Sequence, residues 1–94
     1  MFDIRGLRCL LLPQNELESV SDRIGQLTEL EVLSLKANNI TEIPDGLFEC
    51  KALKRLELSK NRLASDPSGR LLLHLKYLNS LDVMGNPFMG HSQL

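Results

Sequence analysis

Four segments of this chain share one pattern of apolar residues and asparagine, and this repetition limits the folds open to it. Each segment has an apolar residue at its first, fourth and sixth positions, asparagine at the ninth and an apolar residue at the eleventh. The copies start near Leu7, Leu30, Leu53 and Leu78, and their asparagines lie 23, 23 and 25 residues apart. A fixed period of this length indicates a solenoid, in which each repeat packs only against its neighbours.

The spacing inside each copy predicts a strand followed by a return segment. Alternate side chains of a strand share one face, so Leu10, Leu12 and their equivalents are expected to point into the core. The next apolar residues, such as Ile43, Leu47 and Cys50, follow at steps of three and four, which is typical of helical turns that pack behind the strand. Cys50 is therefore expected in the core.

The third copy is two residues longer than the first two, and its extra length lies in the return segment. Asp66-Pro67-Ser68-Gly69 precedes a run of leucines there and resembles the capped start of a helix. We therefore expect a true helix over residues 69–77, on the side of the solenoid opposite the strands.

Asparagine stands where each strand must turn. The four predicted rungs are Asn15, Asn38, Asn61 and Asn86. A side-chain amide both donates and accepts, so each rung can bond backbone groups of its own and an adjacent coil. Buried groups of that kind cost about 1–3 kcal/mol each when unpaired. The rungs are thus expected to stabilise the fold, and Asn86 is expected to matter less because no coil follows it.

With this motif the chain resembles the leucine-rich repeat proteins from Leu7 to Phe88. The resemblance implies one α/β domain over residues 1–94, a solenoid of four repeats with a parallel concave β-sheet and short helices or turns on the convex side. The 23-residue period and the closing Asn86-Pro87 resemble the short intracellular type, which includes phosphatase regulatory subunits and ciliary proteins. The resemblance implies a protein-protein interaction module, or a regulatory or scaffolding subunit.

Side chains of the strands that lie between and beside the core leucines are expected to face a partner on the concave side. These candidate partner-binding residues are Leu11, Val32, Ser34, Lys36, Arg55, Glu57, Ser59, Ser80, Asp82 and Met84. The first copy supplies mainly apolar residues to this face, whereas the last two supply charges. A purely structural interpretation stays open, because single exposed apolar residues are common and exposed ion pairs contribute only about 0–1 kcal/mol.

Composition and motifs argue against other classes of function. The 94 residues carry a formal net charge of −1, which gives no excess charge to attract nucleic acid or an anionic membrane. The chain has no glycine-rich phosphate loop, no CxxC and no HExxH, and His74 has no catalytic partner in the repeat map. We therefore expect no enzyme activity, no cofactor and no metal, and a partner that is another protein.

Location and assembly follow from the cysteines and from the ends. The sequence shows no signal peptide or membrane span, and Cys9 and Cys50 are expected to stay reduced, so we expect an intracellular, cytoplasmic protein. Six residues precede Leu7 and only Met89 to Leu94 follow Phe88, too few for capping units. The alternative function is therefore a self-assembling structural repeat unit, a homo-oligomer through uncapped ends, or a fragment of a longer repeat array.

Overall fold

The computed structural model describes residues 6–89, in which each of the first three repeats forms one coil of a strand and a helical return segment, and the fourth adds a strand and a short 3-10 helix. The uncapped ends expected from the sequence involve residues 1–5 and 90–94, which lie outside the described residues. The elements in chain order are β1 (Cys9–Leu11), the 3-10 helix η1 (Asp22–Gln26), β2 (Val32–Ser34), the 3-10 helix η2 (Asp45–Glu49), β3 (Arg55–Glu57), α1 (Ser68–His74), β4 (Ser80–Asp82) and the 3-10 helix η3 (Pro87–Met89).

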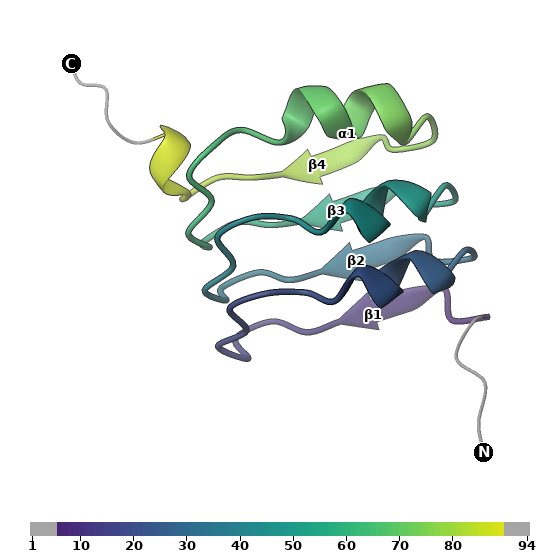
Figure 1. Ribbon diagram of the computed structural model, residues 1–94, viewed down its shortest axis with the longest axis horizontal. Coiled ribbons are helices and arrows are strands. Elements are labelled where there is room, and N and C mark those ends of the chain that lie inside the picture. Colours follow the sequence, from purple (N-terminus) through teal and green to yellow (C-terminus); the bar gives the residue numbers. More distant parts are fainter. Residues whose placement is uncertain (1–5, 90–94) are drawn as a thin grey trace.

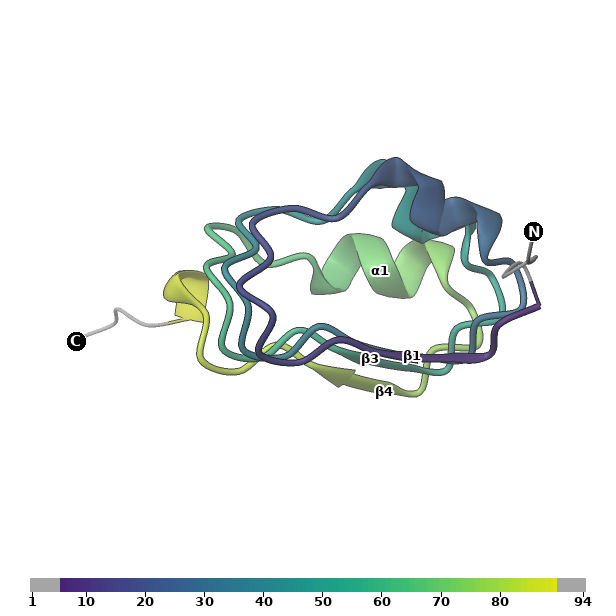
Figure 2. The ribbon, with the colours of Figure 1, turned by 90° about the horizontal axis from the view of Figure 1, so that it is seen from below.

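The four strands form one parallel sheet in the order β1-β2-β3-β4 (Figure 1). Leu10 lies opposite Leu33, Leu33 opposite Leu56, and Leu56 opposite Leu81, so equivalent positions of the repeats are in register. Strands and return segments lie on opposite sides of each coil, as Figure 2 shows along the stack. The predicted four-repeat solenoid is confirmed.

Aliphatic side chains fill the space between the strands and the return segments. Leu30, Leu33, Leu53 and Leu56 are fully buried, and the outer repeats add half-buried residues such as Leu10. The repeat pattern therefore predicted the core, and burial falls off towards the first and last strands.

The asparagine ladder is present, and Asn61 shows how one rung works. Its Nδ2 donates to the carbonyl oxygen of Leu58 in its own repeat at 3.0 Å and to that of Leu35 in the preceding repeat at 2.9 Å. Its Oδ1 accepts from the backbone N–H of Ile40 at 3.1 Å. One side chain thus satisfies backbone groups of two coils.

Asn38, Asn61 and Asn86 each reach back to the preceding coil. Asn86 is 3% exposed, donates to Leu58 O at 2.9 Å and accepts from Leu63 N at 3.1 Å, so these bonds need no following coil, and the effect of Asn86 on stability remains a prediction. Asn15 differs: it is exposed, and within the described residues its side chain makes one hydrogen bond, which it donates to Pro13 O at 3.2 Å. The first rung, not the last, makes the fewest contacts.

The return segments stack closely where two glycines face each other. A Cβ atom added to Gly46 would lie 2.0 Å from Asp22 O, and one added to Gly25 would lie 2.8 Å from Gly46 O. Glycine at both positions therefore allows η1 and η2 to pack at backbone contact. In the third repeat the helix expected over residues 69–77 is present as α1, from Ser68 to His74.

The turn before each rung uses a left-handed backbone. Gln14, Ala37 and Lys60 have φ of 59°, 60° and 58°, and Gly85, at the equivalent position of the fourth repeat, has φ of 74°. Only glycine adopts this conformation without a steric cost. At Ala37 and Lys60 the turn directly precedes Asn38 and Asn61, which are buried in the ladder.

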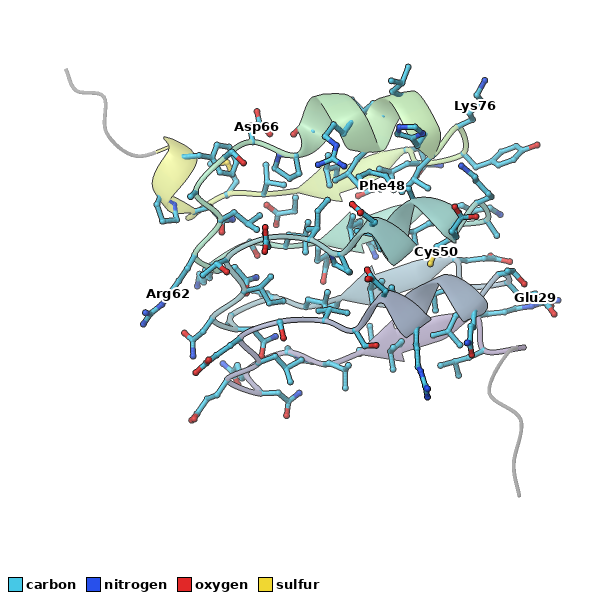
Figure 3. All side chains as sticks on the ribbon, in the orientation of Figure 1. Glu29, Phe48, Cys50, Arg62, Asp66 and Lys76 are labelled. Carbon is cyan, nitrogen blue, oxygen red and sulfur yellow. The ribbon has the colours of Figure 1, made fainter. Side chains whose placement is uncertain are left out.

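Cys50 lies inside the stack, as expected. Its side chain is fully buried between the η1 and η2 layers, and Sγ lies 3.3 Å from Ile24 O, to which it donates (Figure 3). Burial, followed by the nearby charge of Glu49, raises the pKa of the Cys50 thiol to about 11. Cys9 is exposed on β1, and both thiols are free.

Candidate partner-binding face

The solvent-facing side of the sheet, called here the sheet face, presents the repeats as aligned rows. In the strand register, Cys9, Val32, Arg55 and Ser80 form one row, and Leu11, Ser34, Glu57 and Asp82 form the next. A third row follows the strands at Pro13, Lys36, Ser59 and Met84, where Gln14 N, Ala37 N and Lys60 N each donate to the next repeat at 2.8–2.9 Å. Backbone hydrogen bonds therefore hold all three rows in place.

The residues expected on this face differ in how far their side chains are exposed to solvent. Leu11 and Met84 are 58% and 62% exposed. Those also exposed are Lys36, Arg55 and Ser80, and the half-buried ones are Val32, Glu57 and Asp82.

Two of the expected contact residues offer little surface to a partner. Ser34 and Ser59 are each only 4% exposed. Ser34 nevertheless lines the depression described below, so its place as a contact residue remains a prediction.

Ser59 is unusual among the buried polar groups. Its hydroxyl oxygen is the single buried side-chain polar atom without a hydrogen-bond partner within residues 6–89. An unpaired buried hydroxyl destabilises a fold, since burial removes its bonds to water. The side chain next to it along the row, Lys36, is exposed.

The charged end of the sheet face is arranged as the sequence indicated. Glu57 and Asp82 are direct register partners on β3 and β4, and backbones of neighbouring strands lie about 5 Å apart. Asp82 Oδ1 accepts from Met84 N at 3.1 Å, which fixes that carboxylate. Arg55 forms no ion pair within the described part of the chain. These groups are therefore free to meet charges on a partner.

A depression of about 460 Å³ lies on the sheet face towards the first repeats. Its lining combines four of the expected residues with four others. The lining residues are Leu11, Pro13, Gln14, Ser34, Lys36, Ala37, Glu57 and Lys60. Pro13 directly follows the expected row of the first strand, whereas Gln14, Ala37 and Lys60 belong to the turns, which the alternation of strand residues does not identify. Their shared position just before each rung asparagine was the available signal.

The convex side carries a separate cluster beneath α1. Arg70 stacks on the Phe48 ring at 4.7 Å, and the ring of His74 lies 5.0 Å from that of Phe48 (Figure 3). Arg70 also pairs with Asp45 at 3.6 Å. Because these contacts join η2 to α1, the cluster stabilises the packing of the third repeat on the second. His74 thus belongs to the contacts that join η2 and α1.

Residues 6–89 contain no group of three or more histidine, cysteine, aspartate or glutamate side chains placed to hold a metal ion. In the same part of the chain no helix has the length and apolar character needed to cross a membrane.

Comparisons with known proteins agree with this geometry. A sequence profile described as leucine rich repeat matches residues 5–63 and 28–88. A solved leucine-rich repeat protein from Leptospira interrogans is 31% identical and superposes with a TM-score of 0.81, over 88% of this chain and 21% of its own. No match was found among curated proteins. With the profile covering nearly all of the four repeats, the chain belongs to the leucine-rich repeat family.

Proposed function

We propose that this domain binds another protein through the sheet face and performs no catalysis. The main support is the combination of exposed apolar and charged side chains on strands whose positions are fixed by backbone hydrogen bonds. A rigid surface loses little conformational freedom on association, so more of its contact energy becomes affinity. A regulatory or scaffolding subunit, as in the phosphatase regulatory proteins that the sequence resembles, would use such a face.

The charged end of the sheet face provides the test. The double variant Arg55→Glu with Asp82→Lys reverses two charges without changing the net charge. It is expected to lose partner capture from cell extract at physiological salt while unfolding at the same urea concentration as the wild type. Interface charges that meet a complementary surface cost several kcal/mol when reversed.

A matched control keeps this result specific. Arg23→Glu with Glu42→Lys reverses one basic and one acidic exposed residue in the return segments. This variant is expected to capture the same proteins as the wild type. If the sheet-face variant also retrieves them, the charged end is not the contact surface.

A second candidate function is self-association through the end of the stack formed by the last full repeat. Leu72 and Leu73 of α1 are 56% and 70% exposed, and exposed apolar surface of this kind favours contact with another chain. Sedimentation from micromolar to millimolar concentration should then show association that Leu72→Gln with Leu73→Gln abolishes. A wild type that stays monomeric and folded throughout excludes this candidate.

For the location of the protein we propose the cytoplasm. The support is that both cysteines are free thiols and that Cys9 is exposed, where an oxidising compartment would modify it.

A further inference from the structure

The depression on the sheet face has the size of a ligand site. Its volume of about 460 Å³ falls within the roughly 300–1,000 Å³ typical of sites that bind small molecules or short segments. It lies across the first three repeats, since Leu11, Ser34 and Glu57 are consecutive partners in the strand register. A chain segment lying in it would therefore run across the strands and contact all three repeats.

One end of the depression is apolar. Leu11 is 58% exposed, and Pro13 beside it is also exposed. The floor next to them is Ser34, which is buried and short and so leaves room above it. Covering an apolar side chain of a partner here would remove apolar surface from water on both molecules, at about 25 cal/mol per Å².

The side formed by the second and third repeats carries two basic residues. Lys36 and Lys60 both line the depression and are both exposed. Ion pairs within residues 6–89 join Lys54 to Glu31 and Arg70 to Asp45, whereas neither of these two lysines forms one.

The backbones of the two lysines are fixed on their coils. Lys36 O accepts from Gln14 N at 2.9 Å, and Lys60 N donates to Met84 O at 2.8 Å. The two ammonium groups are thus unpaired charges on a rigid support, which suits the binding of an anion.

A third group limits which anion fits. Glu57 also lines the depression, and it lies beside Asp82 in the register. Together with Lys36 and Lys60 it leaves a net charge of +1 there, which one carboxylate neutralises, whereas a phosphate dianion leaves an excess negative charge. A carboxylate is accepted more readily, and the Glu57 side chain can itself accept an N–H from the backbone of the bound segment.

We propose that this depression binds an extended segment of a partner protein in which an apolar side chain is followed by an aspartate or glutamate. The apolar side chain contacts Leu11 and Pro13, the carboxylate lies between Lys36 and Lys60, and a backbone N–H donates to Glu57. This inference rests on the proposed function, because it names the partner chemistry of the same sheet face. Such a segment is selected because its apolar side chain, its carboxylate and its backbone N–H each meet a complementary group in the depression.

The test uses the full chain, labelled with ¹⁵N, and a synthetic peptide of the sequence acetyl-Gly-Leu-Asp-Gly-amide. Titration to millimolar peptide is expected to shift the backbone amide signals of residues that line the depression, Gln14, Lys36 and Lys60 among them. The Asp→Asn peptide should bind at least tenfold more weakly, and so should a peptide with phosphoserine in place of aspartate. Glu57→Gln should improve binding of the phosphoserine peptide.

Charge reversal adds a gain-of-binding result that loss of folding cannot imitate. Lys36→Glu with Lys60→Glu should lose the aspartate peptide by at least tenfold and bind the Asp→Lys peptide instead. The matched control, Lys51→Glu with Lys76→Glu, reverses two lysines that line a pocket beside Tyr77 rather than the depression. It should bind the aspartate peptide like the wild type.

Each contrary result overturns the inference. Equal binding of the aspartate and asparagine peptides removes the role of the carboxylate, and shifts confined to other surfaces place the site elsewhere. Absence of shifts at millimolar peptide excludes this ligand, while stronger binding of the phosphoserine peptide reassigns the site to phosphate. If the peptide test fails while Arg55→Glu with Asp82→Lys still loses capture, the proposed function stands without this inference. Unchanged capture in that variant shows instead that the charged end of the sheet face is not the contact surface.

Discussion

The first and third repeats have the same sequence pattern, yet they differ in how far that pattern is buried. In the third repeat Leu56 is fully buried and Asn61 is 6% exposed, because a coil packs on each side. In the first repeat Leu10 is half-buried and Asn15 is exposed. A leucine-rich repeat motif therefore determines which side chains point towards the core, while the neighbouring coils determine how much each of them contributes to stability.

The sharpest test of this difference is Asn61→Ala. It should lower the free energy of unfolding by about 3 kcal/mol, the upper end of the usual cost, because backbone groups of two coils lose their partner together. Urea denaturation followed by circular dichroism measures it. A midpoint equal to that of the wild type would show that the ladder does not stabilise the stack.

Asn86→Ala comes next, with an expected loss of about 2 kcal/mol. The bonds from Asn86 to Leu58 O and from Leu63 N make it a complete rung despite its place at the last repeat. The same denaturation experiment compares Asn86→Ala with Asn61→Ala, because the sequence-based expectation is that Asn86 matters less than the interior rungs. A loss no larger than that of Asn15→Ala would show that these two bonds do not stabilise the last repeat.

The buried thiol of the interior predicts a dependence on pH. Because burial raises the pKa of Cys50 from 9.0 to about 11, the folded thiol stays neutral between these values while the unfolded thiol ionises. Wild type and Cys50→Ala should therefore differ in stability by a constant amount below pH 9. By pH 11 the free energy of unfolding of the wild type should have fallen by about 2 kcal/mol relative to that of Cys50→Ala.

Denaturation of both proteins across that range measures the change. Because lysine and tyrosine titrate in both proteins, their contributions cancel. A difference that does not vary with pH would mean that Cys50 is accessible to water in the folded protein.

Ser59→Ala should have a smaller effect and the opposite sign. Removing a buried hydroxyl that has no hydrogen-bond partner is expected to raise the free energy of unfolding by about 1 kcal/mol. Ser80→Ala, at an exposed position of the sheet face, serves as the control and should change little. A destabilised Ser59→Ala would reveal a hydrogen bond to that hydroxyl.

The smallest expected effect is that of Asn15→Ala, below about 0.5 kcal/mol, as for most surface substitutions. Its side chain bonds one exposed carbonyl of its own turn. If Asn15→Ala lowered the free energy of unfolding as much as Asn61→Ala does, the first and third repeats would not differ in what this asparagine contributes. Urea denaturation of both variants under the same conditions gives the ratio of the two losses.

The sequence predicted the fold well because the solenoid is determined by local spacing. Strands, register, core leucines and the third-repeat helix all follow from positions within one repeat, as Leu33 and Leu56 illustrate. The sequence did not show which neighbouring coil each asparagine bonds. An amide such as that of Asn86 can bond either coil, and only the arrangement of the coils decides between them.

The candidate site was only partly predictable. Strand alternation identified exposed residues such as Leu11 and Arg55, but it also placed on this face Ser34, which is only 4% exposed. Lys60 was missed because it belongs to the turn, whose left-handed backbone brings it to the rim of the depression.

The backward reach of the rungs also bears on how the chain folds as it is made. The turn at Asn15 and Leu17 gains its side-chain partner only when Asn38 has been synthesised, and the turn at Ile40 waits in the same way for Asn61. On the ribosome, the backbone N–H groups of each turn thus have no side-chain partner until about one further repeat has emerged. The asparagine of that next repeat then accepts their hydrogen bonds. We expect the nascent chain to acquire structure in steps of one repeat, starting with the N-terminal coil, and each newly made asparagine to complete the coil before its own.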